Sequence, residues 1–163
     1  MSRNKRLSIL TAAEVEDLYG VPSFNESYQR FYFMLNDKEL AEISRIRQRK
    51  YRCVAIALLG YFKCKPVLLN PRYKSMQDDL VFIARFHYRD LTFRRFSLKP
   101  DQKSRIYARV LSIVGVSNWN DKRHQPQLVE HLCTCAESWV EPRAVFDAAI
   151  EYLARQKIAI PAY

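Results

Sequence analysis

Five basic side chains gather within eight residues of the sequence, with no acidic residue among them: Arg45, Arg47, Arg49, Lys50 and Arg52. Guanidinium and ammonium groups spaced in this way bind phosphates along a nucleic acid backbone, which gives affinity that depends on salt and not on base sequence. Two alternatives remain open: a solvated basic face for the whole cluster and, for Arg52, an ion pair with a carboxylate. We favour phosphate contact for the cluster.

A second pattern lies between residues 104 and 112, where Arg105 and Arg109 are one helical turn apart. Ser104, Ala108 and Ser112 are small and share their face, so a partner could approach the helix closely. Arginine reads guanine edges with two hydrogen bonds in the major groove of DNA. We therefore expect this helix to read bases, although an ordinary exposed helix with scattered arginines looks similar.

Two further groups of cations are candidates for DNA contact. Arg3, Lys5 and Arg6 could form an arm that enters a minor groove or follows phosphates, or else a solubilising tail. Lys122 and Arg123 precede an expected helix and could meet phosphates there.

The cysteines and histidines do not predict a metal site. His131, Cys133 and Cys135 are at positions i, i+2 and i+4 of an expected helix, where Cys133 points away from Cys135. We expect all three to be ordinary core or surface residues. His87 falls in line with the apolar Leu80, so we expect a packed histidine there.

No constellation of residues predicts catalysis or a cofactor. The sequence has no glycine-rich phosphate loop and no nucleophile elbow. Asp78 and Asp79 are adjacent, so on a helix they diverge by about 100 degrees and do not converge on one metal. We expect them to serve the start of a helix instead, and we expect a chain that is not an enzyme and binds no small molecule.

Composition limits the fold and the partner. The 163 residues carry a net charge of +10 with a sequence pI near 9.6, which favours a polyanionic partner. Only 3 glycines and 7 prolines argue for an all-α fold against turn-rich barrels and sandwiches. The four cysteines lie within or beside apolar runs without an apolar leader, and residues 54–62 are too few to span a membrane. We expect a cytoplasmic protein.

The helical signals are local and regular. Thr11 with Glu14 and Asn36 with Glu39 form capping boxes, Pro100 and Gly115 bracket a helix, and an apolar stripe runs from 51 to 62. We expect eight helices, beginning near residues 12, 25, 37, 51, 75, 100, 126 and 142. Ser75 is the expected cap of the fifth, residues 90–99 should be irregular, and residues 158–161 look like a linker.

Residues 65–74, with two prolines and an asparagine, predict a connection between lobes. We place an amino-terminal helical lobe at 1–68 and a second at 69–163, with at least one helix-turn-helix-like unit. The alternative is one extended bundle.

Three stretches also follow one another in a known order. The first is Arg6-Leu7-Ser8-Ile9-Leu10-Thr11-Ala12-Ala13-Glu14. The second combines Arg30-Phe31-Tyr32, Asn36-Asp37-Lys38-Glu39-Leu40, Ile46-Arg47-Gln48-Arg49 and Arg52. The third is Arg155-Gln156-Lys157-Ile158-Ala159-Ile160-Pro161-Ala162. Together they resemble the amino-terminal domain of the Tn-three family of replicative transposases. The chain departs from the family pattern at residues 53–56 and 104–106, which indicates a diverged relative.

This resemblance implies a bacterial protein whose amino-terminal region recognises the terminal inverted repeats of a transposon. The metal-dependent strand-transfer site would then lie outside this chain, and the full-length protein could be a homodimer. We therefore expect sequence-specific binding of duplex DNA. The alternatives are an RNA-binding module, disfavoured because most aromatic residues fall on expected core stripes, and a protein-interaction scaffold with an incidental basic face.

Overall fold

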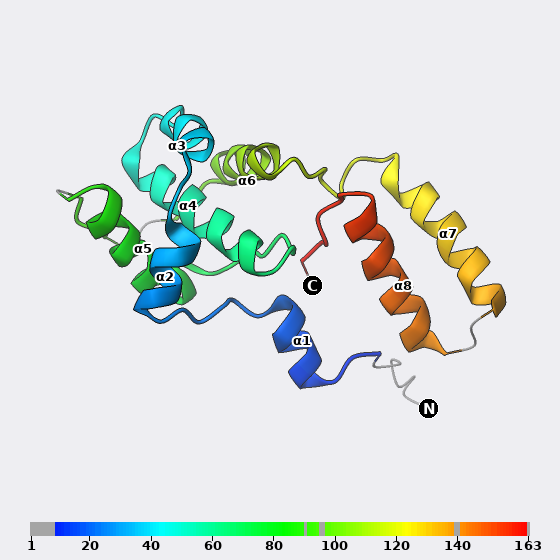
Figure 1. Ribbon diagram of the computed structural model, residues 1–163. Helices are drawn as coiled ribbons and strands as arrows, with labels where there is room; N and C mark the ends of the chain where they lie inside the picture. The colour runs from blue at the N-terminus through cyan, green and yellow to red at the C-terminus, as the bar shows by residue number, and fades with distance from the viewer. Residues whose placement is uncertain (1–8, 90, 95–96, 139–140, 163) are drawn as a thin grey trace.

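The computed structural model describes residues 9–89, 91–94, 97–138 and 141–162. Within them the chain forms eight α-helices and no β-sheet (Figure 1), which confirms the predicted all-α class. The helices are α1 (Ala12–Tyr19), α2 (Glu26–Phe33), α3 (Asp37–Ser44), α4 (Arg49–Cys64), α5 (Tyr73–His87), α6 (Pro100–Val114), α7 (His124–Ser138) and α8 (Pro142–Arg155).

Most helix ends lie where local sequence signals predicted them. Both capping boxes are formed, by Thr11 with Glu14 on α1 and by Asn36 with Glu39 on α3. The start of α5 differs, because the helix begins at Tyr73 and Ser75 does not cap it. Tyr73 packs against the core, and this tertiary contact extends the helix beyond the expected cap.

Helix α4 is the centre of the fold (Figure 1). All residues from Cys53 to Phe62 are buried, because α2, α3, α5 and α6 all pack against this helix. Gly60 allows a close contact with α2: a Cβ atom there would lie 2.6 Å from two ring atoms of Phe33. The apolar core continues from α4 into α5, α6 and α8, so it crosses the predicted boundary at 68/69. The division into two lobes stays a prediction.

A buried carboxylate links three helices at this core. The Tyr61 hydroxyl of α4 donates to Asp79 of α5 at 2.5 Å, and the Gln29 side chain of α2 donates to its other oxygen at 2.8 Å. Burial raises the pKa of Asp79, while these two donors act to lower it. The expectation that Asp78 and Asp79 serve a helix start was wrong, because α5 begins at Tyr73, more than one turn earlier, and Asp79 is buried.

Helices α6 and α8 end in the same way. The amide of Val116 donates to the Leu111 carbonyl and the amide of Ile158 to the Leu153 carbonyl, as in a Schellman motif. Gly115 and Lys157 occupy the left-handed position, with φ of 68° and 53°. The side chain at 157 makes this conformation less favourable than at a glycine.

The residues after α8 are built into the core. Ile158 forms an isolated parallel bridge with Ser117, and Ile160 forms another with Val67. Residues 158–160 are all at most 4% exposed. The expectation of a linker at 158–161 was therefore wrong for these three residues, since their apolar side chains fill the space between two loops.

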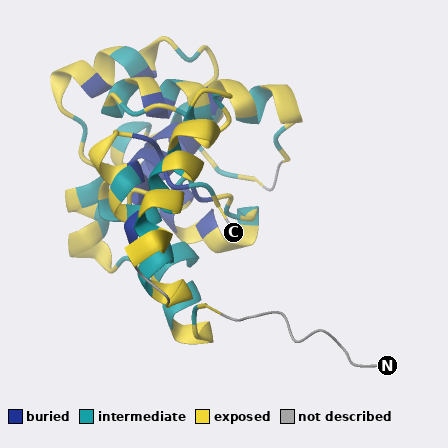
Figure 2. Ribbon diagram, turned by 90° about the vertical axis from the view of Figure 1, so that its right-hand side faces the viewer, coloured by how far each residue is buried: buried dark blue, intermediate teal, exposed yellow. Residues whose placement is uncertain are grey.

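Helices α7 and α8 form a hairpin beside this core (Figures 1 and 2). No residue described in α7 is buried, and Figure 2, seen from the side of this hairpin, shows exposed and half-buried residues along the near helices. His131 of α7 stacks on Tyr152 of α8 with ring centroids 4.7 Å apart. The hairpin is thus held largely by contacts between its own two helices.

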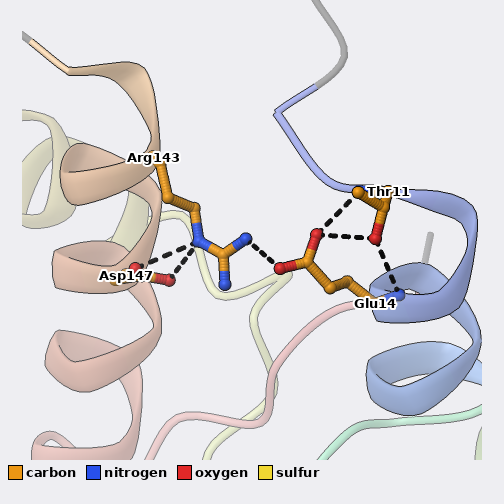
Figure 3. Close-up of polar contacts among 4 residues, drawn as sticks. All are labelled: Thr11, Glu14, Arg143 and Asp147. Carbon is orange, nitrogen blue, oxygen red and sulfur yellow. Dashed lines mark hydrogen bonds and ion pairs between the residues drawn. The ribbon is translucent and has the colours of Figure 1, made fainter.

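An ion pair joins this hairpin to the first helix (Figure 3). Arg143 of α8 contacts Glu14 of α1 at 2.5 Å and Asp147 at 3.0 Å. The Thr11 backbone amide and then the Arg143 guanidinium stabilise the Glu14 carboxylate, and they lower its pKa from 4.5 to about 2. The same glutamate therefore caps α1 and ties it to α8.

This contact predicts a pH-dependent contribution to stability. Because the pKa of Glu14 is lower in the folded chain than in the unfolded one, its stabilising effect is present above about pH 4.5 and is lost as the pH falls towards about 2. We expect Glu14→Gln to lower the Tm at neutral pH and to match the unmodified chain near pH 2. Thermal unfolding followed by circular dichroism across this range measures the difference. Glu16→Gln, on the same helix outside the Arg143 contact, is the control, and a Glu14→Gln deficit that does not change with pH contradicts the assignment.

Candidate nucleic-acid interface

The turn between α3 and α4 carries the predicted basic cluster. Arg52 shapes this turn, because its Nε donates to the Ile46 carbonyl at 2.6 Å and its terminal nitrogen to the Ser44 carbonyl at 2.8 Å. A guanidinium at the carboxyl end of a helix satisfies carbonyls that have no partner within the helix. The considered pairing of Arg52 with a carboxylate is therefore replaced by backbone contacts, and Arg52 holds the turn that presents its neighbours.

Glu42 brings the two predicted basic patterns onto one surface. Its carboxylate contacts Arg45 at 2.9 Å and Arg109 of α6 at 2.7 Å, so α3 and α6 are bridged by one acid between two arginines. The Arg45 side chain remains 65% exposed, while that of Arg109 is 36% exposed. Arg109 could read a base only by leaving Glu42, which disfavours the expected reading role.

The other candidates on this surface point to solvent. Arg47 lies in the turn, Arg49 is the first residue of α4 and Arg105 lies on α6. All three side chains are exposed. Lys50 is exposed as well, with its amino group 5.0 Å above the Tyr51 ring. Arg49 and Arg52 also lower the pKa of the nearby Tyr88, although burial raises it more. The basic surface thus reaches the carboxyl end of α5.

Helix α6 has the two-faced character that its sequence predicted. Ile106, Val110 and Leu111 are buried, while the small side chains at 104, 108 and 112 are exposed. This open face lies beside α3 and carries Arg105. By contrast, α4 cannot enter a groove with its central part, since all its sides from residue 53 to 62 are buried. The unit formed by α3, the turn and α4 therefore has the order of elements of a helix-turn-helix, but its second helix is not free to enter a groove.

Positive charge is concentrated in the middle of the sequence. Residues 44–115 contain 17 lysines and arginines against 4 acids, whereas residues 116–163 contain 5 against 6. In the second segment Arg123 contacts Asp121 of its own loop at 2.7 Å, and it lowers the pKa of that acid. Lys122 is exposed beside it, and Figure 1 shows this loop between α6 and α7, away from α3. Arg3, Lys5 and Arg6 lie outside the described residues.

The remaining candidates have plain structural surroundings. His87 lies 2.9 Å from the Phe33 carbonyl through its Nε2 atom, which confirms a packed histidine. His131 Nε2 lies 3.7 Å from Cys135 Sγ, and Cys133 is exposed. Across the described ranges, no three histidine, cysteine or acidic side chains are grouped as metal ligands would be.

None of the described helices combines the length and the apolar character that crossing a bilayer requires.

The fold and this surface define an all-α domain with a strongly basic central region. The chain belongs to the family described as domain of unknown function DUF4158, whose model matches residues 9–163. No curated protein and no solved structure matches the sequence.

Proposed function

We propose that this chain binds duplex DNA through the surface made by the α3–α4 turn and the exposed face of α6. The single observation that carries the proposal is Glu42, which joins Arg45 and Arg109 and so makes one basic surface from two segments far apart in sequence. Phosphate binding by several arginines along such a surface gives the largest part of the affinity of many DNA-binding proteins. The concentration of cations between residues 44 and 115 supports it.

The resemblance to the Tn-three transposases supports a more specific function. We propose that the chain serves as their non-catalytic DNA-binding region and recognises terminal inverted repeats. In this role Arg45, Arg47 and Arg49 contact phosphates, which fixes the position of α6, and Arg105 contacts a base edge. Arg109 holds α6 against α3.

Single substitutions separate these roles. Arg47→Ala should weaken binding to a terminal repeat and to a scrambled duplex by the same factor and lower the salt slope by about 0.9, as expected for one lost phosphate contact. Arg105→Ala should cost about 1–3 kcal/mol on the repeat and much less on the scrambled duplex. Anisotropy titrations of both duplexes at fixed salt measure these effects.

Two further variants complete the test. Arg109→Ala should lower the Tm and weaken both duplexes alike, because it removes the tie to Glu42. Arg123→Ala is the matched control, since this arginine lies on the α6–α7 loop. Unchanged binding by both Arg47→Ala and Arg105→Ala would exclude the surface. If Arg109→Ala lowers the affinity for the terminal repeat but not for the scrambled duplex, Arg109 itself contacts a base edge.

A further inference from the structure

A groove of about 600 Å³ lies between α2 and α5, on a part of the molecule that the duplex surface does not use. Gln29 and Arg30 of α2 form one wall. Val81, Phe82 and Phe86 of α5 line the groove from the other side, together with Arg85. The groove therefore combines an apolar lining with basic side chains.

The apolar lining contains two stacked rings. The centroids of Phe82 and Phe86 are 5.7 Å apart and their planes differ by 11°. Phe86 is 47% exposed and Val81 is 44% exposed, although both belong to a helix whose other face is in the core. A half-exposed ring in line with a second ring offers a flat surface on which another planar ring can stack.

The charges around this lining favour an anionic occupant. Arg30 is held by Glu26 at 2.7 Å, so that pair contributes no net charge. Arg85 lies in the last turn of α5 and Arg89 lies two residues beyond its end; both are exposed and both line the groove. Of the two neighbouring acids of α5, Asp78 borders the groove, whereas Asp79 is directed to Tyr61 and Gln29 in the core.

One residue of the groove, Arg89, lies close in sequence to a residue that neighbours the basic surface. Tyr88 follows α5 directly, and its pKa is influenced by both Arg49 and Arg52. Arg85 and Arg89 lie on either side of it in sequence. The end of the groove that carries Arg89 therefore lies towards the α3–α4 turn.

We infer that the α2–α5 groove binds unpaired bases of a DNA strand, with one base stacked on Phe86 and the flanking phosphates on Arg85 and Arg89. Stacked rings and arginines together form the usual site for single strands, because every base has a face that can stack. Bases within a duplex are covered by their neighbours and cannot enter. The inference extends the proposed function from duplex DNA to a single-stranded segment beside it.

The test compares two phenylalanines of equal size. Phe86→Ala should weaken binding of an oligothymidylate of about 12 nucleotides by about fivefold or more and leave duplex affinity unchanged within about twofold. Phe31 is 72% exposed on α2 but does not line the groove, so Phe31→Ala is the matched control and should bind normally. Anisotropy with labelled oligonucleotides measures affinity, and a 2-aminopurine base reports stacking through its fluorescence. Unchanged melting curves show that the variants fold.

Several outcomes would overturn the inference. These are no binding of the oligothymidylate at low salt, equal losses for Phe31→Ala and Phe86→Ala, or tighter binding of an oligouridylate that also needs Phe86. If duplex binding is absent while the oligothymidylate still depends on Phe86, the proposed duplex function fails and the groove assignment stands.

Discussion

The affinity of the chain for duplex DNA is expected to fall about a hundredfold between about 50 and about 200 mM monovalent salt. Arg45, Arg47, Arg49 and Lys50 are exposed on one surface, and each phosphate that they neutralise releases bound counterions. Contacts by these side chains give a slope of log affinity against log salt of about −3.6. Anisotropy titrations over a salt series measure this slope.

A matched pair of multiple variants tests its origin. Replacing Arg45, Arg47 and Arg49 together by alanine should reduce the slope by about three units, or slightly less. Replacing Lys122 and Arg123 together should leave it nearly unchanged, because their loop lies apart from α3. A slope that is shallow in the unmodified chain, or one that depends equally on both groups, rules out the α3–α4 turn as the main phosphate contact.

Gly60→Val is expected to destabilise the fold by about 3 kcal/mol, since overpacking of a buried helix contact forces side chains or backbone to move. The added Cβ alone would lie 2.6 Å from the Phe33 ring and 3.1 Å from the Tyr32 carbonyl oxygen. Phe33 is fully buried, so its ring has little room to move away. Urea denaturation gives the free energy of unfolding.

A double-mutant cycle shows whether the ring is the cause. Phe33→Ala should itself cost about 3–5 kcal/mol by leaving a cavity. The double variant Gly60→Val/Phe33→Ala should lose less than the sum of the two, by about 1 kcal/mol or more, because the valine occupies part of that cavity. Strict additivity would mean that α2 and α4 do not meet through these two residues.

The sequence predicted the elements whose signals are local. Capping depends on residues three positions apart, as in Thr11 with Glu14, and a left-handed helix end depends on one residue such as Gly115. Both were confirmed. The basic turn was also visible, because its five cations fall within eight residues of the sequence. The sequence did not show that the Arg52 side chain turns back to the carbonyls of Ser44 and Ile46. The spacing of apolar residues shows which face of a helix is buried, but not the direction that a long basic side chain takes.

Contacts between distant segments account for the rest. Glu42 lies in the same turn of helix as Arg45, which gives a local hint, but its second partner is 67 residues away and becomes evident only once α6 packs on α3. The aromatic residues were expected mainly in the core, yet Phe31 and Phe86 are exposed. Helical spacing alone does not show which side of α2 and α5 the neighbouring helices leave uncovered.

The burial of residues 158–160 has a consequence for the order of folding. The bridge between Val67 and Ile160 joins segments that are far apart in sequence, so its loop-closure entropy delays its formation relative to local helix contacts. We expect α2 to α6 to collapse first, with the α7–α8 hairpin docking when residues 158–160 insert beside Val67 and Ser117. Until then Val67 lacks its bridge partner. During synthesis, a chain whose residue 160 is still inside the ribosome would therefore expose the apolar surface around Val67. Exposed apolar surface of this kind is where chaperones bind and aggregation starts.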